Sequence, residues 1–219
     1  MKSTITITQI AQESGVSVAT VSRFLNGKVP VSADKKARIE AVVRKYDFTP
    51  NALARGLISK RTMTLGVILP DITNPYFATI FQEVQRCAAE EGYSVYLCNT
   101  RFHHGDAPID ETGYFRMMMD KKVDGILIIG GQLDMVGPNP AYKEALNKLA
   151  ASIPVVAAGR EISGAGCIFI DSENGSGVTT AYNYLSSLGH KDIAFVGGQP
   201  GVTITETRLE SYKKDAAAS

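Results

Sequence analysis

Residues 7–27 read ITQIAQESGVSVATVSRFLNG, and this stretch decides how the N-terminal part of the chain folds. Apolar residues recur at helical spacing over 7–14 and again over 17–26, and Ser14-Gly15 separates the two segments. A third segment of the same kind, 32–46, begins with a serine, a residue type that caps helix N-termini. Helix, tight turn, helix and supporting helix is the helix-turn-helix plan, although the spacing alone also fits a generic three-helix bundle.

The charge of the chain is concentrated near its N-terminus. The formal net charge is only +1, but residues 1–61 hold eleven Lys and Arg against four acidic residues, an excess of seven positive charges. The remaining 158 residues are therefore mildly acidic. Such asymmetry indicates a basic module that binds a polyanion, joined to a body that does not need one.

From Met63 onward, apolar runs alternate with amphipathic segments. Continuous apolar strands that alternate with helices predict a parallel sheet covered on both faces, and ligands of such folds bind beyond the carboxyl ends of the strands. The predicted strands are 64–69, 94–98, 125–129, 155–157, 168–170 and 193–196, and the predicted helices are 75–91, 110–122, 142–151 and 175–188.

Composition and length exclude several classes of protein. The chain has 219 residues, of which 44% are hydrophobic, so a mainly disordered chain is excluded. No apolar run approaches a membrane span, and the first residues lack the apolar stretch of a secretory signal, so we expect a cytoplasmic protein. The three cysteines, Cys87, Cys98 and Cys167, are far apart and predict reduced, buried thiols.

Several runs of residues resemble the lactose/galactose-repressor family of transcriptional regulators. In the N-terminal part these are 7–11, 15–23, Asn26-Gly27 and 50–57; in the body they are 66–68, 70–77, 123–126 and 189–196. The resemblance covers the whole chain. It implies an all-α helix-turn-helix headpiece with a hinge helix, followed by an α/β Rossmann-like domain of the periplasmic-binding-protein type.

The resemblance also implies a division into parts. The headpiece would be 1–49, the hinge 50–61, the first effector-binding subdomain 62–160 and part of a second subdomain 161–219. Members of the family continue for roughly another hundred residues, about the size of a typical domain. The second subdomain is therefore expected to be incomplete, and the effector response of such a chain could be impaired.

The second helix carries the expected contacts to operator DNA. A recognition helix presents its first turn to base edges in the major groove, and here that turn is 17–20. Arg23, one turn further on, can make a bidentate contact to guanine, the commonest specific pairing. The resemblance assigns operator contact to Ser17, Val18, Ala19, Thr20, Arg23 and Asn26. The alternative for Ser17 and Ser22 is local capping or solvation.

The hinge is expected to contact the minor groove. By resemblance, the hinges of two subunits pair there, and Leu57 wedges between base pairs of a pseudo-palindromic double-stranded operator. Asn51, Ala54 and Arg55 would face groove or phosphate. The alternative for Leu57 is packing on its own subunit. The implied assembly is a homodimer, weakened in this chain by the missing segment.

A small polar effector, most simply a sugar or sugar phosphate, is expected at the carboxyl ends of the strands. Asp71, Asn74, Tyr76 and Phe77 follow the first strand and combine aromatic faces with polar groups, as a sugar requires. The resemblance adds Arg208, which could hold a hydroxyl, carboxylate or phosphate. Tyr76 and Phe77 could instead be core, and Asp171, the last candidate, could be a helix cap.

Other chemistries are not supported by the sequence. His103-His104 with Asp106 is a weak metal pattern, and the glycine pairs at 164–166 and 175–177 lack the remainder of a nucleotide-binding fingerprint. No serine lies in a GxSxG elbow. We therefore expect no enzyme, no cofactor and no metal. The alternatives to a DNA-binding regulator are a periplasmic-type sugar-binding protein and a nucleotide-dependent enzyme.

Overall fold

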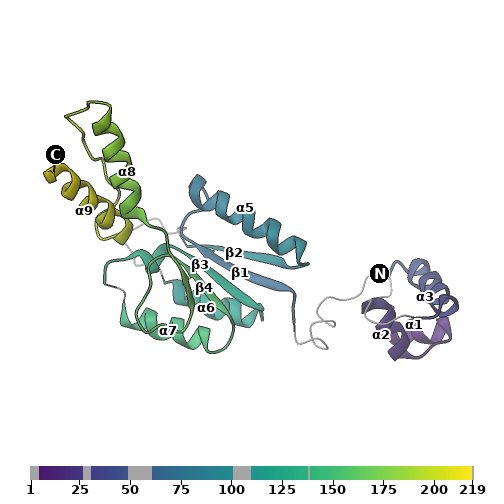
Figure 1. Ribbon diagram of the computed structural model, residues 1–219. Helices are drawn as coiled ribbons and strands as arrows, with labels where there is room; N and C mark the ends of the chain where they lie inside the picture. Colours follow the sequence, from purple (N-terminus) through teal and green to yellow (C-terminus); the bar gives the residue numbers. More distant parts are fainter. Residues whose placement is uncertain (1–4, 27–30, 49–60, 101–109, 138, 219) are drawn as a thin grey trace. The chain divides into compact units, whose positions relative to one another are not determined.

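The computed structural model describes residues 5–26, 31–48, 61–100, 110–137 and 139–218. The chain divides into two compact units, Met1–Lys60 and Arg61–Ser219, shown in Figure 1. Each unit has its own hydrophobic core, and each is described here by itself.

The first unit, the headpiece, consists of three helices in its described residues. They are α1 (Ile7–Ser14), α2 (Val18–Asn26) and α3 (Ala33–Lys45), and all three lie where the sequence predicts helices. Each helix contributes apolar side chains to one small core. Its buried members are Ile5, Ile10, Ala11, Val21, Ile39 and Val42.

Local residues fix the ends of these helices. Thr6 and Gln9 form a capping box before α1, and Gly15 ends that helix in the left-handed conformation at φ 64°. Ser17 Oγ accepts a hydrogen bond from the Thr20 N–H at 3.2 Å and so helps α2 to begin. Ser32 stands at the N-cap of α3, as predicted, but its side chain makes no capping hydrogen bond.

The second unit, the α/β unit, is built on a five-stranded parallel sheet in the order β2-β1-β3-β4-β5. The strands are β1 (Thr64–Leu69), β2 (Ser94–Asn99), β3 (Gly125–Ile129), β4 (Val155–Ala158) and β5 (Ile168–Ile170). The parallel pairing and the first five predicted strands are confirmed. β5, which follows the predicted boundary at 160/161, is the edge strand of this sheet, while the boundary itself stays a prediction.

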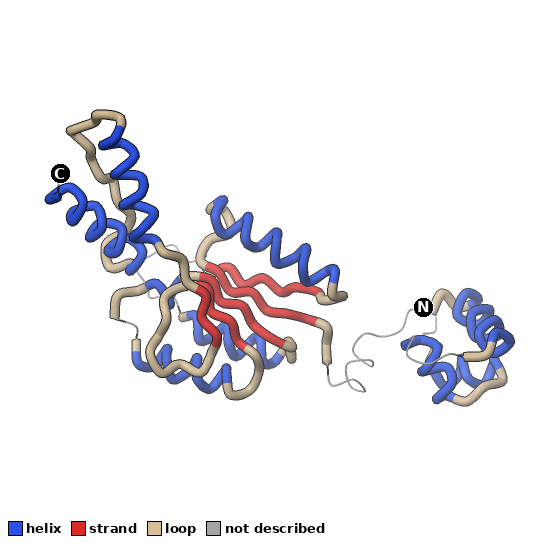
Figure 2. The backbone as a smooth tube through the Cα atoms, in the orientation of Figure 1, coloured by secondary structure: helices blue, strands red, loops and turns tan. Residues whose placement is uncertain are grey.

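Helices cover both faces of the sheet, as Figures 1 and 2 show. On one face, α5 (Pro75–Glu90) packs against β1 and β2. On the other face lie α6 (Glu111–Asp120) and α7 (Pro140–Ala150). Side chains of β1 alternate between the two cores, since Val67 and Leu69 pack toward α5 and Ile68 toward α6 and α7. The apolar run of β1 is therefore explained by burial on both faces.

The last part of the chain corrects one prediction. Residues 193–196 do not form a strand, because no described strand runs alongside them to pair with their backbone groups. Val196 is 95% exposed. Helix α8 (Asn174–Ser187) was expected, whereas its packing partner α9 (Thr203–Ala218) was not.

The cysteines also differ from expectation. Cys98 is buried and Cys167 half-buried, but Cys87 is exposed on α5, so the prediction of three buried thiols is wrong for Cys87. Burial raises the pKa of the Cys98 thiol to about 11. Among the described helices, none is both long enough and apolar enough to cross a membrane.

Candidate DNA-binding surface and effector cleft

The first turn of α2 is exposed while the helix is anchored from behind. Ser17, Val18 and Ala19 are exposed, and Thr20 is half-buried. Val21 is fully buried in the headpiece core and fixes the orientation of the helix. Val18 is 42% exposed, which is unusual for a valine that begins a helix beside a core. The residues predicted to read base edges thus share one accessible surface of small side chains.

Arg23 lies one turn beyond Ala19 on the same helix and is exposed. It forms no ion pair with any residue in the described parts of the chain, so its guanidinium is available to an external acceptor. Asn26 is the last residue of α2. The hinge residues Asn51, Ala54, Arg55 and Leu57 lie outside the described residues, and their roles stay predictions.

Ion pairs hold α3 against α1 on another side of the headpiece. Lys45 Nζ lies 3.1 Å from Glu13 Oε2, and the Tyr46 hydroxyl donates to Glu13 Oε1. The hydrogen bond from Tyr46 and the Lys45 ammonium lower the pKa of Glu13 below its ordinary value. These contacts pair Glu13 with Lys45 and Tyr46 and leave Arg23 outside the network.

The predicted effector residues after β1 serve mainly local structure. Asn74 caps α5, since its Oδ1 accepts the Tyr76 N–H at 3.0 Å. Asp71 Oδ1 accepts the Thr73 N–H at 3.0 Å. Phe77 packs in the core beneath α5, as the alternative interpretation has it, whereas Tyr76 is 60% exposed. The two rings meet edge to face at 5.1 Å between centroids.

A second group of predicted residues borders a cleft of about 420 Å³, which we call the effector cleft. It contains Asp171 and the start of α8, and the guanidinium of Arg208 donates to Asn174 Oδ1 at 2.6 Å. None of its described lining residues comes from the segment after β1. Asp171 therefore lines the same cleft as Asn174, the acceptor of the Arg208 hydrogen bond, whereas Tyr76 and Phe77 are not among its described lining residues. The lining residues are Arg160, Asp171, Ser172, Glu173, Asn174, Gly175, Ser176, Thr203, Ile204 and Thr207.

The sequence analysis did not identify two buried carboxyl groups near this cleft. Glu111, the first residue of α6, is 2% exposed, and Asp134, in the short 3-10 helix η1 (Gly131–Asp134), is 8% exposed. Glu111 Oε2 and Asp134 Oδ1 are buried without a hydrogen-bond partner. The sequence placed Glu111 in the predicted helix 110–122 and gave no sign of its burial, because the turn at Gly130-Gly131 that folds over it lies far along the chain.

The environment of both groups favours the neutral acid. Burial raises the pKa of Glu111 to about 7, although the Gln132 N–H and the Tyr142 phenol lower it in part. Burial also raises the pKa of Asp134, as does the charge of Asp171, while the backbone N–H of Arg160 lowers it. Perturbed carboxyl groups at the carboxyl edge of a parallel sheet are typical of a ligand-binding region.

The described residues contain no cluster of three or more side chains able to hold a metal ion. The histidines His103 and His104, and Asp106, lie outside the described residues, so the weak metal pattern there is not tested.

Both units match models of known protein families. Residues 6–51 match the model of bacterial regulatory proteins of the lacI family, and residues 62–218 match the model of periplasmic binding proteins and the sugar-binding domain of the LacI family. The chain belongs to the LacI family. The resemblance inferred from the sequence motifs and the predicted fold class are confirmed.

Individual relatives agree with this assignment. Catabolite control protein A of Staphylococcus xylosus is 35% identical over 210 residues, which cover 96% of this chain and 60% of the relative. A crystal structure of the Lac repressor dimer bound to operator and an anti-inducer superposes with a TM-score of 0.80 at 20% identity, covering 98% of this chain and 62% of that one. A Cra regulator from Pseudomonas putida in complex with fructose 1-phosphate gives a TM-score of 0.58 at 22% identity, covering 71% and 54%.

The chain thus spans about 60% of the length of the curated relatives that it matches. The solved structures are less than 25% identical to it and show the shared fold.

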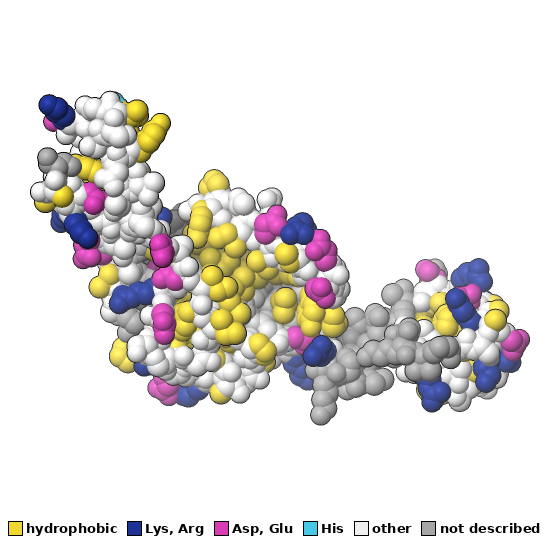
Figure 3. Space-filling view, viewed as in Figure 1, with side chains coloured by type: hydrophobic (Ala, Val, Ile, Leu, Met, Phe, Trp, Pro, Cys, Tyr) yellow, Lys and Arg dark blue, Asp and Glu magenta, His cyan; other side chains and the backbone are white. Residues whose placement is uncertain are grey.

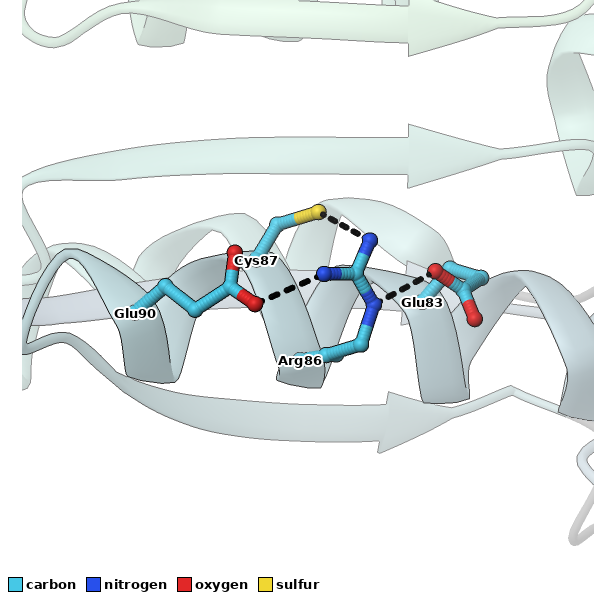
Figure 4. Close-up of polar contacts among 4 residues, drawn as sticks. All are labelled: Glu83, Arg86, Cys87 and Glu90. Atoms are coloured by element: carbon cyan, nitrogen blue, oxygen red, sulfur yellow. Dashed lines mark hydrogen bonds and ion pairs between the residues drawn. The ribbon is translucent and has the colours of Figure 1, made fainter.

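Helix α5 carries polar side chains on its outer side. The Arg86 guanidinium lies 2.9 Å from Glu83 Oε2 and 2.7 Å from Glu90 Oε1, and it contacts Cys87 Sγ at 3.5 Å (Figure 4). These side chains are exposed, so their ion pairs contribute little to stability.

Beside α5 runs an apolar groove of about 610 Å³. Figure 3 shows hydrophobic side chains gathered on the visible face of the α/β unit, next to this helix. The groove is lined by Leu65, Thr79, Ile80, Glu83, Val84, Cys87, Ala88, Glu91 and Tyr93.

Proposed function

We propose that this LacI-family chain is a sequence-specific DNA-binding transcriptional regulator, acting as a repressor, whose binding to its operator is controlled by a small polar effector. The observation that carries the proposal is the exposed first turn of α2 on a headpiece with an excess of seven positive charges. A helix with small side chains can approach base edges closely, and the positive charge attracts the phosphate backbone. The protein acts where the DNA is, in the cytoplasm, and no catalytic chemistry is assigned to it.

Within the headpiece the roles divide by chemistry. Ser17, Val18, Ala19 and Thr20 approach base edges, and the methyl groups of Val18 and Ala19 suit the methyl of thymine. Arg23 reads guanine in the major groove. Asn26 and the hinge residues, with Leu57 as a wedge in the minor groove, complete the contacts.

The effector is a sugar or sugar phosphate that binds at the carboxyl edge of the sheet. Four hydroxyl side chains line the effector cleft, Ser172, Ser176, Thr203 and Thr207, together with the guanidinium of Arg160. Arg208 and Asn174 form a polar clamp beside them. Asp71, Asn74 and the exposed ring of Tyr76 contribute when the effector draws the two groups of residues together, while Phe77 supports the Tyr76 ring from the core. Fructose 1-phosphate, the ligand in the solved structure of the Cra regulator, is a sugar phosphate.

The functional unit is a homodimer on a pseudo-palindromic operator. The Lac repressor in the matched crystal structure is a dimer bound to operator, and a single headpiece can occupy only one half-site. The apolar groove beside α5 supplies part of the surface. Specific binding is therefore expected to require two copies of the chain and to depend on protein concentration.

Selection from random duplexes tests the function directly. The chain is incubated with a random DNA library, and the bound duplexes are amplified and sequenced over several rounds. Enrichment of a pseudo-palindromic sequence is the expected result, and binding to it should weaken steeply with salt because phosphate contacts release counterions. Recovery of unenriched DNA would contradict a sequence-specific regulator and favour the sugar-binding alternative.

A matched ligand pair tests the effector. D-fructose and fructose 1-phosphate are titrated by calorimetry into the protein alone and with the selected operator, and each sugar should change the operator affinity if it binds. Binding of the phosphorylated sugar alone would assign the cleft to an anionic effector. Binding of neither, in a broader panel of sugars and sugar phosphates, would contradict the sugar assignment while leaving the DNA result intact.

A further inference from the structure

The carboxyl group of Glu111 lies directly against the turn that follows β3. Its Oε1 accepts a hydrogen bond of 2.8 Å from the backbone N–H of Gln132. The contact is so close that a Cβ atom added at Gly131 would lie 2.0 Å from Oε1. Gly130 and Gly131 both adopt positive φ, at 63° and 69°, which brings the turn back over the start of α6. Glu111 therefore fixes the position of this turn.

The same turn carries Asp134 to the edge of the effector cleft. Gly130 N–H donates to Ala158 O at 3.0 Å, which joins the turn to the end of β4. A Cβ atom added at Gly159 would lie 2.9 Å from Asp134 Oδ1, so the carboxyl fills the space above that glycine. The backbone N–H of the next residue, Arg160, interacts with the Asp134 carboxyl, and Arg160 lines the cleft. Glu111 and the cleft are thus connected through η1.

Few groups are available to stabilise a charge on Glu111. The titratable groups that face it from the packed elements are Asp134 on η1 and Tyr142 on α7. Asp134 brings a like charge; the Tyr142 phenol faces the carboxyl and offsets part of the effect of burial on its pKa, but it is not hydrogen-bonded to Glu111 Oε2, which stays without a partner. An ionised carboxylate in such surroundings costs free energy, so a small change in its environment changes its protonation.

We propose that Glu111 is a positioning residue that couples the uptake of one proton to the shape of the effector cleft. The proposal deepens the proposed function, on which its regulatory meaning rests. The buried position against the turn favours the neutral acid, so protonated Glu111 keeps η1 in its described position. Ionisation favours an arrangement in which water reaches the carboxylate, so η1 and Asp134 loosen and the wall at Arg160 changes. Ligand affinity at the cleft is therefore greater when Glu111 is protonated.

Backbone amide resonances report on this coupling without any ligand. The full chain is labelled with nitrogen-15, and the amide signals of Gln132 and Arg160 are followed from pH 5.5 to 8.5. Since the pKa of Glu111 is raised to about 7, both signals should titrate together with a midpoint near pH 7. In Glu111→Gln both titrations should disappear, and the signals should stay close to their low-pH positions in the wild-type chain.

A neighbouring carboxyl provides the control. Asp110 caps α6 one residue earlier, its pKa is lowered by the hydrogen bond from Thr112, and it stays ionised over this pH range. Asp110→Asn should therefore leave both titrations unchanged. Tyr142→Phe removes a group that lowers the Glu111 pKa and should move the midpoint to higher pH, which keeps the test open if Glu111→Gln does not fold.

Two outcomes would overturn the coupling. One is a Gln132 signal that titrates while Arg160 does not, because Glu111 would then be a local structural acid with no link to the cleft. The other is a pair of titrations that persists in Glu111→Gln. Failure of sugars to bind in the calorimetric screen contradicts the proposed function instead, and the amide titrations decide the coupling in either case.

Discussion

The headpiece and the α/β unit differ in where the polar groups of their candidate sites lie. In the headpiece the residues assigned to DNA lie on the surface, and the core behind them is apolar. Ser14, the one buried polar side chain among the described residues of the headpiece, donates to the backbone oxygen of Ile10 at 2.6 Å and is satisfied within its own helix. In the α/β unit, Glu111 and Asp134 are buried at the edge of the sheet where a ligand would bind, and each keeps an unpartnered oxygen.

This difference distinguishes the proposed recognition of DNA by the headpiece from the proposed recognition of a small effector by the α/β unit. DNA is read by side chains that protrude from a stable framework, so changing them should leave the framework intact. A small molecule is read by groups that are part of the interior, so changes there alter stability and binding together. The predictions that follow test this separation, beginning with the largest expected effect.

Removing apolar volume from the α/β core should destabilise that unit strongly. Leu146 on α7 is fully buried in the same cluster as Tyr142, and Leu146→Ala should lower the free energy of unfolding of the α/β unit by about 2–5 kcal/mol. Leu188, which follows α8 and is 59% exposed, is the matched control, and Leu188→Ala should change it by less than about 0.5 kcal/mol. Chemical denaturation, followed by circular dichroism, measures both.

The two units are not independent if the unfolding transition of the headpiece also shifts in Leu146→Ala. Both leucines lie in the α/β unit, so loss of headpiece helicity in Leu146→Ala at denaturant concentrations where the wild-type headpiece is folded would show that the two cores are energetically coupled.

Replacing Glu111 should change how stability depends on pH. Its folded-state pKa of about 7 lies above its ordinary value of 4.5, so the folded chain binds more protons between these values. The Glu111 contribution to stability is fully present below pH 4.5 and declines as the pH rises to 7. Glu111→Gln does not ionise, so its stability advantage over the wild-type chain should grow over this interval to about 3 kcal/mol and stay level above it.

Urea denaturation at half-unit pH steps measures this advantage. Asp110→Asn serves again as the control, because its carboxyl is exposed and its pKa is lowered rather than raised. A Glu111→Gln chain whose stability runs parallel to that of the wild-type chain from pH 4.5 to 8 would contradict a buried, proton-sensitive Glu111.

The sequence predicted most of the architecture because the relevant signals are local or repeated. The apolar runs of β1 and β3 and the turn at Gly15 determine their own structure, and their predicted bounds agree with those observed. The prediction of a strand at 193–196 was wrong. A strand is stabilised by pairing with neighbouring strands, and a local sequence pattern does not show whether such neighbours exist.

The candidate site was predicted unevenly for the same reason. Helical periodicity predicts the burial of Val21, but it puts Val18 on nearly the same face, so the exposure of Val18 at the start of α2 does not follow from it. The burial of Glu111 depends instead on a turn about twenty residues away, whose N–H at Gln132 meets the carboxyl only in the folded chain. Sequence spacing carries no information on such a contact.

Removing the guanidinium of Arg23 should weaken specific DNA binding without affecting folding. Arg23 is exposed and forms no ion pair among the described residues, so Arg23→Ala should leave the stability of the headpiece unchanged. Affinity for the selected operator should fall by about 1–3 kcal/mol, with little change for random duplex DNA. Fluorescence anisotropy on both duplexes at one salt concentration measures the difference, and equal losses on both would make Arg23 a phosphate contact.

The smallest effect concerns two serines that precede helices of the headpiece. Ser17 Oγ accepts the Thr20 N–H at 3.2 Å, whereas the side chain of Ser32 makes no capping hydrogen bond before α3. Ser17→Ala should therefore lower the free energy of unfolding of the headpiece by about 1 kcal/mol, and Ser32→Ala by clearly less. Thermal unfolding of the three chains, followed by circular dichroism, measures the difference. Because Ser17 is also exposed beside Val18, its substitution should weaken operator binding even where the headpiece is fully folded. Unchanged operator affinity at low temperature, with the stability loss retained, would assign Ser17 to capping alone and move the base-reading surface one residue further along α2.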